Sequence, residues 1–430
     1  DITRDPRWGR IAESFGEDPF LASVLSVAMV EGFQTDDLSR PDSMAACGKH
    51  FAGYGAAEGG RDYNTTLIPE RELRDVYLKP FQAASKAGVA TLMAAFNEID
   101  GIPASGHRQL LTGILRDEWG FEGFVVSDWD GIPEMIVHGF AADSKEAAER
   151  AFLAGLNMEM ATDLYRRHLP ELIANGNVAG EWLDDRVREI LRVKFRMGLF
   201  RNPGLRPRSA SGSESQLNAG HVRESYEAAV QSVVMLKNDA RLLPLNPDGG
   251  QRIAVIGPLA DAPREQLGTW TFDGRADDSA TPLAALRAQL GEHAIRYAPG
   301  TSHSRSRETD GFAEAVEAAN WSDVVLLFAG EEAILSGEAH CLANIDLQGS
   351  QNALVERIAD TGKPVVLVLL TGRPNTIGQL LPKVDAVLAA FHGGTMAGPA
   401  LADLLFGRRS PCGRLPVTWP RAVGQIPIHY

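Results

Sequence analysis

The sequence predicts an α/β protein with two domains joined by a linker. Residues 1–200 alternate short apolar strands with longer helices, which is typical of βαβ units and a parallel sheet. Residues 201–220 are rich in proline, glycine and serine, which predicts a linker. In residues 221–430 near-continuous apolar strands alternate with helices again, as in a three-layer α/β sandwich with a mostly parallel sheet covered on both faces.

In the first domain we expect four strands, at residues 44–48, 89–96, 124–127 and 156–160, and helices at 70–86, 144–154 and 181–197. Pro80 should kink the first helix, and Gly88 should stop it. Asp143 and Glu146 are spaced as a capping box for the second helix. Four strands are too few for a closed eight-stranded barrel, which takes about 250 residues. We therefore expect the front of such a barrel to precede Asp1.

In the second domain we expect strands at residues 253–256, 324–329, 365–370 and 386–390, and helices at 222–236, 282–290, 311–319, 350–360 and 396–406. The segment IAVIGPLAD has one glycine after its strand and not the three of a dinucleotide-binding fingerprint, and no P-loop motif occurs. Nucleotide binding is therefore not indicated.

Composition and charge exclude several classes of function. The net charge of −14 argues against nucleic acid as a partner, because binding a polyanion requires a cationic surface. A neutral or weakly charged substrate fits better. No apolar stretch is long enough to cross a bilayer, so no membrane partner is expected. The three cysteines are far apart and the histidines do not cluster, so neither a metal nor another cofactor is indicated.

Two acids flank a tryptophan at the end of an apolar run, in FEGFVVSDWDG. A buried strand ending at Ser127 sets Asp128 and Asp130 at its carboxyl end, where parallel α/β folds place catalytic groups. Asp128 is thus a candidate catalytic carboxylate. From this stretch alone, the cap of a following helix is the favoured interpretation.

A second polar pair, Lys49 and His50, follows the small-residue strand MAACG. Such a pair is usually only solvated, but the carboxyl ends of parallel strands converge on one face. Trp129 offers either an apolar wall for a sugar ring or ordinary core packing. Arg10 lies in an arginine-rich loop, where a surface ion pair is the alternative.

The loop after the strand VVLLFAG carries four candidate acids, namely Glu331, Glu332, Glu338 and Asp346. Long loops inside compact domains are usually functional or disordered. A loop from a strand's carboxyl end is able to carry an acid toward Asp128. Spacing alone does not choose Glu338 over Glu332.

Five motifs in order carry a family resemblance, namely DPRWGRIAESFGEDP, GKHFAGYGAAEGGRDYN, FEGFVVSDWDG, GKPVVLVLLTGRP and SPCGRLPVTWPRAVGQIPI. Together they resemble glycoside hydrolase family 3, in particular its bacterial periplasmic or secreted β-glucosidases. The resemblance covers essentially the whole chain. It implies a (β/α)8-type TIM barrel followed by a six-stranded α/β sandwich, and a retaining, exo-acting β-glucosidase that acts on small oligosaccharides or glucosides. The sequence leaves the oligomeric state open and is compatible with an oligomer.

The resemblance also implies site residues. Asp128 matches the nucleophile and Glu338 the acid/base. The residues that match sugar-contacting positions are Arg10, Lys49, His50 and Trp129, and Trp270 resembles an aromatic residue on the leaving-group side. Phe96 stands where the family usually has a tyrosine, so a hydroxyl contact is absent there.

Related activities give the alternatives. The family's N-acetylglucosaminidases use a K-H-F-P-G-H-G loop, whereas this chain has Ala52 and Tyr54 in KHFAGYG, so a glucosidase with a glutamate acid/base is favoured. A β-xylosidase and a non-catalytic glycan-binding protein are the alternative functions. The likeness to periplasmic or secreted enzymes predicts the same location.

Overall fold

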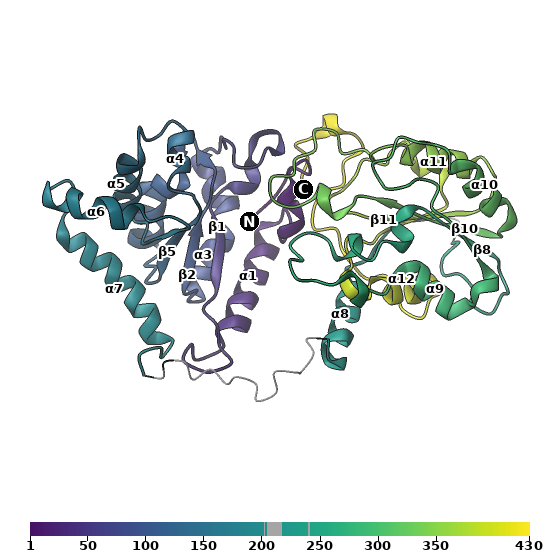
Figure 1. The fold of residues 1–430 in the computed structure, drawn as a ribbon, viewed down its shortest axis with the longest axis horizontal. Coiled ribbons are helices and arrows are strands. Elements are labelled where there is room, and N and C mark those ends of the chain that lie inside the picture. Colours follow the sequence, from purple (N-terminus) through teal and green to yellow (C-terminus); the bar gives the residue numbers. More distant parts are fainter. Residues whose placement is uncertain (202, 204–216, 240) are drawn as a thin grey trace. The chain divides into compact units, whose positions relative to one another are not determined.

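The computed structural model describes residues 1–201, 203, 217–239 and 241–430, and the chain divides into two compact units (Figure 1). The first unit comprises Asp1–Arg4 and Glu13–Ser213, and the second comprises Asp5–Ala12 and Glu214–Tyr430. The short segment Asp5–Ala12 therefore belongs to the second unit, although the residues on both sides of it belong to the first. Most of the predicted linker falls on residues 202 and 204–216, which lie outside the described residues.

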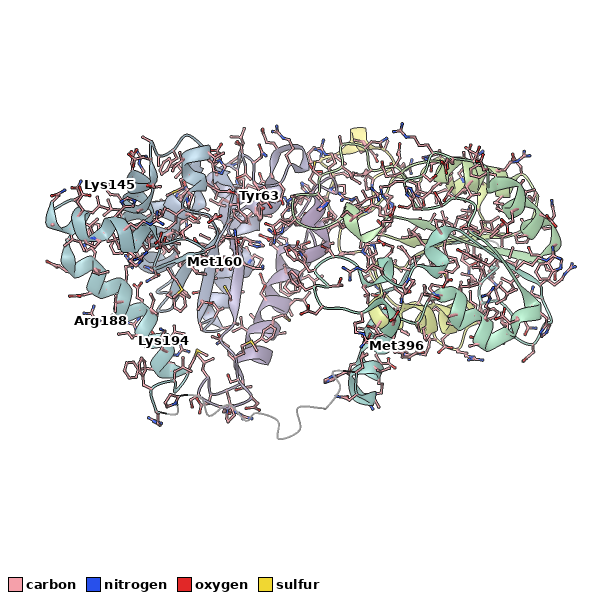
Figure 2. All side chains as sticks on the ribbon, in the orientation of Figure 1. Tyr63, Lys145, Met160, Arg188, Lys194 and Met396 are labelled. Carbon is pink, nitrogen blue, oxygen red and sulfur yellow. The ribbon has the colours of Figure 1, made fainter. Side chains whose placement is uncertain are left out.

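The first unit contains a four-stranded parallel sheet with the strand order β1-β2-β5-β6. Its strands are β1 (Cys47–Phe51), β2 (Thr91–Ala94), β5 (Phe124–Trp129) and β6 (Met158–Met160), and β3 (Glu98–Ile99) and β4 (Ile102–Pro103) form a separate antiparallel pair. The carboxyl end of β6 is marked by Met160 in Figure 2. Because all four strands run in parallel, their carboxyl ends share one edge of the sheet.

The first strand lies three residues later than the sequence predicts. The predicted range is 44–48, but β1 is Cys47–Phe51, so Lys49 and His50 lie inside the strand and do not follow it. Pairing with β2 sets these limits, from Cys47 opposite Thr91 to Phe51 opposite Ala94. Such tertiary pairing overrides the local pattern of small residues and charges.

The helices of the first unit are α1 (Pro19–Gln34), α2 (Glu70–Glu72), α3 (Lys79–Lys86), α4 (Glu134–Val137), α5 (Ser144–Ala154), α6 (Leu164–Ala174) and α7 (Gly180–Arg196), with π-helical segments at Leu73–Tyr77 and Gln109–Glu118. The helix predicted at 144–154 is confirmed. Its cap Asp143 accepts hydrogen bonds from the backbone N–H groups of Lys145 and Glu146, both at 2.9 Å. The helix predicted at 70–86 is interrupted before Pro80, which lies in the first turn of α3.

The second unit is built on a six-stranded sheet with the order β7-β12-β11-β10-β8-β9. Its strands are β7 (Val234–Asn238), β8 (Ile253–Ile256), β9 (Ile295–Ala298), β10 (Val324–Gly330), β11 (Val365–Leu370) and β12 (Ala386–Ala389). All neighbours pair in parallel except the edge strand β7, which runs antiparallel to β12. The sequence does not predict β7 and β9, because both are edge strands with mixed polar and apolar residues.

Helices cover both faces of this sheet, as Figure 1 shows. The helices α8 (Ala219–Ser232), α9 (Pro282–Leu290) and α12 (Ala397–Leu405) share one apolar core with alternate strand residues, and α10 (Phe312–Trp321) and α11 (Gln351–Ala359) share the other. In β10, Leu326 and Phe328 face the first core, and Val325 and Leu327 face the second. The predicted three-layer arrangement is therefore confirmed for this unit.

For one helix of this unit, the predicted carboxyl end is wrong. The sequence predicts a helix over 222–236, but α8 ends at Ser232 and Val234–Asn238 is strand β7. Residues Val234–Asn238 instead join the sheet, because their backbone pairs with β12, with Val234, for example, opposite Ala389. Tertiary pairing again decides the element, because a short apolar run fits a helix or a strand.

Candidate active site

Asp128 is the penultimate residue of β5, and its residue surface is 9% exposed. Its Oδ1 accepts a hydrogen bond from the backbone N–H of Trp129 at 2.7 Å. Its Oδ2 lies 3.4 Å from His50 Nε2 and has no hydrogen-bond partner among the described residues. The helix-cap interpretation does not hold, because α4 begins at Glu134 with Pro133 as its N-cap. The Oδ2 atom of Asp128 is thus buried beside a histidine and accepts no hydrogen bond from the described residues.

His50 connects Asp128 with a second carboxylate, that of Asp1. The imidazole of His50 is buried, and its Nδ1 lies 2.9 Å from Asp1 Oδ2. The backbone N–H of His50 also donates to Asp1 Oδ1 at 3.3 Å. Asp1 fixes the orientation of the ring, as outer carboxylates do for functional histidines. The sequence does not reveal this role, because no motif relates two residues that are 49 positions apart.

Lys49 is exposed and lies on the wall of a cavity of about 190 Å³ that Asp1 and Cys47 also line. Burial raises the pKa of the Cys47 thiol, and Lys49 partly opposes that rise. The structure thus brings His50 to Asp128 and places Lys49 on this neighbouring cavity.

The aromatic residues near Asp128 have different environments. Trp129 is 65% exposed, so the core-packing interpretation of this residue is wrong. Phe96 is buried and packs edge-on against Tyr54 and Tyr63, with ring centroids 6.1 and 5.0 Å away; Tyr63 is labelled in Figure 2. An apolar ring fits this aromatic cluster, and the ring faces of Trp129 remain open to a ligand.

In the second unit, three of the predicted site residues lie together. The side chain of Arg10 is only 2% exposed, and its Nη1 lies 3.6 Å from Glu338 Oε1. The guanidinium carbon of Arg10 is 5.8 Å from the centroid of the Trp270 ring. Arg10 is therefore not the surface ion pair that its arginine-rich loop suggests. Glu338 keeps 26% of its side chain exposed.

The other three acids of the loop are held in hydrogen bonds that give each a structural role. Glu331 is fully buried and pairs with Arg373 Nε at 3.1 Å. Glu332 Oε2 accepts from Ser304 at 2.8 Å and from Arg305 Nε at 3.0 Å. Asp346 accepts a hydrogen bond from the hydroxyl of Thr376.

Local surroundings shift the pKa values of two of these carboxyl groups in opposite directions. Burial raises the pKa of Glu331, and Arg373 and Asn375 oppose the rise only in part. Burial alone also raises the pKa of Glu332, but hydrogen bonds from Arg305 and Ser304 outweigh it, so that the pKa of Glu332 falls below its ordinary value.

A pocket of about 650 Å³ lies beside the Glu338 loop, with Trp270, Phe272, Arg305 and His340 among its lining residues. It is formed by the loops after β8, β9 and β10, and the sheet order puts a topological switch point between β8 and β10. Open α/β sheets bind ligands at such a point, outside the carboxyl ends of the strands. The rings of Trp270 and Phe272 lie 5.5 Å apart, and Phe272, which the sequence does not single out, is 80% exposed. The pocket thus offers an apolar wall for a ring-shaped ligand.

The part of the chain that the structure describes contains no group of three or more histidine, cysteine, aspartate or glutamate side chains suited to hold a metal ion. Among the same residues, no helix is both long and apolar enough to span a membrane.

Comparison with known proteins gives matches along nearly the whole chain. Residues 1–193 match the family described as Glycosyl hydrolase family 3 N terminal domain, and residues 233–430 match the Glycosyl hydrolase family 3 C-terminal domain. The chain is 41% identical to a periplasmic beta-glucosidase of Salmonella typhimurium, over 100% of this chain and 59% of that protein. It is 37% identical to a beta-xylosidase of Formosa agariphila, over 99% of this chain and 61% of that protein.

Solved structures of a beta-glucosidase from Listeria innocua are also similar. The complex with isofagomine has a TM-score of 0.94 and 39% identity, and the match covers 100% of this chain and 60% of that one. A mutant of the same enzyme in complex with laminaribiose has the same TM-score, 0.94. The chain spans about three fifths of the length of the curated relatives that it matches.

Proposed function

Because the chain belongs to glycosyl hydrolase family 3, we propose that it acts as a retaining, exo-acting β-glucosidase on small oligosaccharides or glucosides. The observation that carries this proposal is the buried, unbonded Oδ2 of Asp128 beside His50. The similarity to a periplasmic beta-glucosidase and to a beta-glucosidase solved with laminaribiose supports the choice of substrate.

In the proposed first step, Asp128 Oδ2 attacks the anomeric carbon of the terminal glucosyl unit as the glycosidic C–O bond breaks. A carboxylate nucleophile must be ionised and needs an oxygen with a lone pair directed at the anomeric carbon. Asp128 offers its free Oδ2 atom for this role, and its other oxygen is held by the backbone N–H of Trp129. The Nε2 atom of His50 lies 3.4 Å from this free oxygen.

Glu338 is the proposed general acid and base. It gives its proton to the leaving oxygen in the first step and takes a proton from water in the second, when the bond between the sugar and Asp128 breaks. Retention of configuration requires the two carboxyl groups to lie about 5–5.5 Å apart during reaction. The exposure of Glu338 supports this role, because 26% of its side chain is exposed, compared with 0% for Glu331 and 15% for Glu332.

The remaining predicted residues are proposed to bind the sugar. Arg10, Lys49 and His50 provide hydrogen-bond donors for hydroxyl groups, and exposed Trp129 provides an apolar ring face. The pocket walled by Trp270 and Phe272 is proposed to take the leaving group. Phe96 contributes through packing, because it carries no hydroxyl and is buried in its aromatic cluster.

Two further proposals concern fold and location. We propose that the four parallel strands of the first unit are part of a (β/α)8-type barrel, which their strand order and the family support. The similarity to a periplasmic beta-glucosidase supports a periplasmic or secreted location.

A panel of aryl β-glycosides tests the proposed activity. The expected result is release of the chromogenic aglycone from β-glucosides with retention of the anomeric configuration. The 37% identical beta-xylosidase makes β-xylosidase activity the second candidate, and faster cleavage of aryl β-xylosides favours it. Sugar binding without hydrolysis of any member of the panel points instead to a glycan-binding protein.

A further inference from the structure

The segment Asp5–Ala12, here called the strap, is bound along the Glu338 loop (residues 331–342). Trp8 forms an antiparallel bridge with Cys341, and the N–H of Leu342 donates to Arg7 O at 3.0 Å. The N–H of Gly337 donates to Gly9 O at 2.8 Å. These backbone contacts lie on both sides of Glu338 in the sequence, so the strap determines where the loop runs.

Gly9 is a point of close approach between the strap and the loop. A Cβ atom at this position lies only 1.8 Å from His340 O and 2.3 Å from Gly337 O. Both neighbours are backbone atoms and cannot turn away as a flexible side chain can. Any residue larger than glycine must therefore push the Glu338 loop away from the strap.

Arg373 forms hydrogen bonds to both the strap and the loop. Its fully buried guanidinium pairs with Glu331 at 3.1 Å and donates to the carbonyl oxygen of Leu335. It also donates to Pro6 O at 2.9 Å and to Arg7 O at 3.0 Å in the strap. The planar fork of arginine reaches all these acceptors at once, whereas a lysine ammonium at this position has the same charge and a different geometry.

We propose that Gly9 and Arg373 are positioning residues for the acid/base Glu338. They hold the loop so that Glu338 stays beside Arg10, and neither residue touches substrate. This inference rests on the proposed function of Glu338. An acid displaced by about 1 Å loses on the order of a hundredfold in rate, so the positioning has a measurable effect.

The test compares Gly9→Ala and Arg373→Lys in the full chain, on aryl glucosides with good and poor leaving groups. Poor leaving groups need the proton of Glu338, and good ones do not. We expect kcat/KM for the poor leaving group to fall at least about tenfold more than for the good one, with azide restoring part of the rate on the good one. An equal loss on both substrates overturns the proposal and leaves a purely structural role.

Gly413→Ala is the matched control, because its Cβ lies 2.5 Å from Ser232 O in the same unit but away from the strap and the loop. It should change stability without any dependence on the leaving group. Hydrogen exchange of residues 331–342 gives a readout that does not need activity, and faster exchange in Gly9→Ala than in Gly413→Ala is expected.

The two proposals fail in distinguishable ways. If the unsubstituted protein hydrolyses no glycoside, the proposed function is refuted. Hydrogen exchange of residues 331–342 then tests only whether Gly9 holds the loop in place. Unchanged exchange of residues 331–342 in Gly9→Ala overturns the positioning role.

Discussion

At the scale of single residues, Asp128 shows how a side chain's hydrogen bonds determine what it is able to do. Its Oδ1 is bonded to the Trp129 N–H and its Oδ2 is not bonded, so one oxygen is held and the other is available. Asp128→Asn keeps the shape and removes the negative charge. We expect kcat to fall at least about a thousandfold while glucose binding is largely kept, as measured by steady-state kinetics and calorimetry.

The neighbour Asp130 gives a matched control for that substitution. Its backbone has φ 54°, a left-handed conformation that asparagine also adopts readily, so Asp130→Asn is tolerated. Its effect on kcat should be much smaller. Comparable losses in the two variants contradict the assignment of Asp128.

Glu338→Ala separates leaving-group protonation from the rest of catalysis. For substrates with activated leaving groups, kcat/KM should fall far less than for natural glucosides, and azide should restore part of the rate by attacking the glycosyl-enzyme. The comparison variant is Glu332→Ala, since Glu332 is tied to Arg305 and Ser304. If Glu332→Ala gives that pattern and Glu338→Ala does not, the acid/base is Glu332.

At the scale of elements, the cap of α5 makes stability depend on pH. Hydrogen bonds from the backbone N–H groups of Glu146 and Lys145 lower the pKa of Asp143 in the folded protein. Its stabilising effect is therefore fully present above the unfolded pKa of about 3.9 and is lost as pH falls through the lower folded pKa. Asp143→Ala should lower Tm at neutral pH, and the difference from the unsubstituted protein should become smaller in acid.

Asp143→Asn is the control for this titration. Asparagine keeps a side-chain oxygen that caps the helix, but it does not titrate in this range. Its Tm at neutral pH should lie close to that of the unsubstituted protein, and its stability should respond less to acid. A Tm difference between Asp143→Ala and the unsubstituted protein that stays undiminished in acid rules out this explanation.

At the scale of the whole chain, the second unit depends on strands that are buried on both faces. Leu326 of β10 is fully buried in the core shared with α9 and α12. Leu326→Ala should lower the free energy of unfolding by about 2–5 kcal/mol, because the cavity refills only partly. Urea denaturation measures the loss. Met235→Ala in the edge strand β7 is the control and should change it by about 0.5 kcal/mol or less, since Met235 is exposed.

The sequence predicts most of the elements whose limits depend on residues within the element itself. The predicted ranges of β8, β11, α9 and α5 agree with the structure at both ends, because continuous apolar runs, caps and stop signals lie within each segment. The limits of β1 and the change from α8 to β7 are not predictable in this way. Backbone pairing with distant strands determines both.

For the candidate site, the sequence by itself determined the residue types and the chain order, including Asp128 at the end of a buried strand. It also predicted that Asp128 and His50 lie at one end of a parallel sheet. Only the tertiary structure decided that Asp1 orients His50. It also decided that Glu331 forms an ion pair with Arg373 and that Glu332 forms one with Arg305. These partners lie tens of residues apart in the sequence. A local sequence pattern does not show which distant groups form hydrogen bonds with a carboxylate.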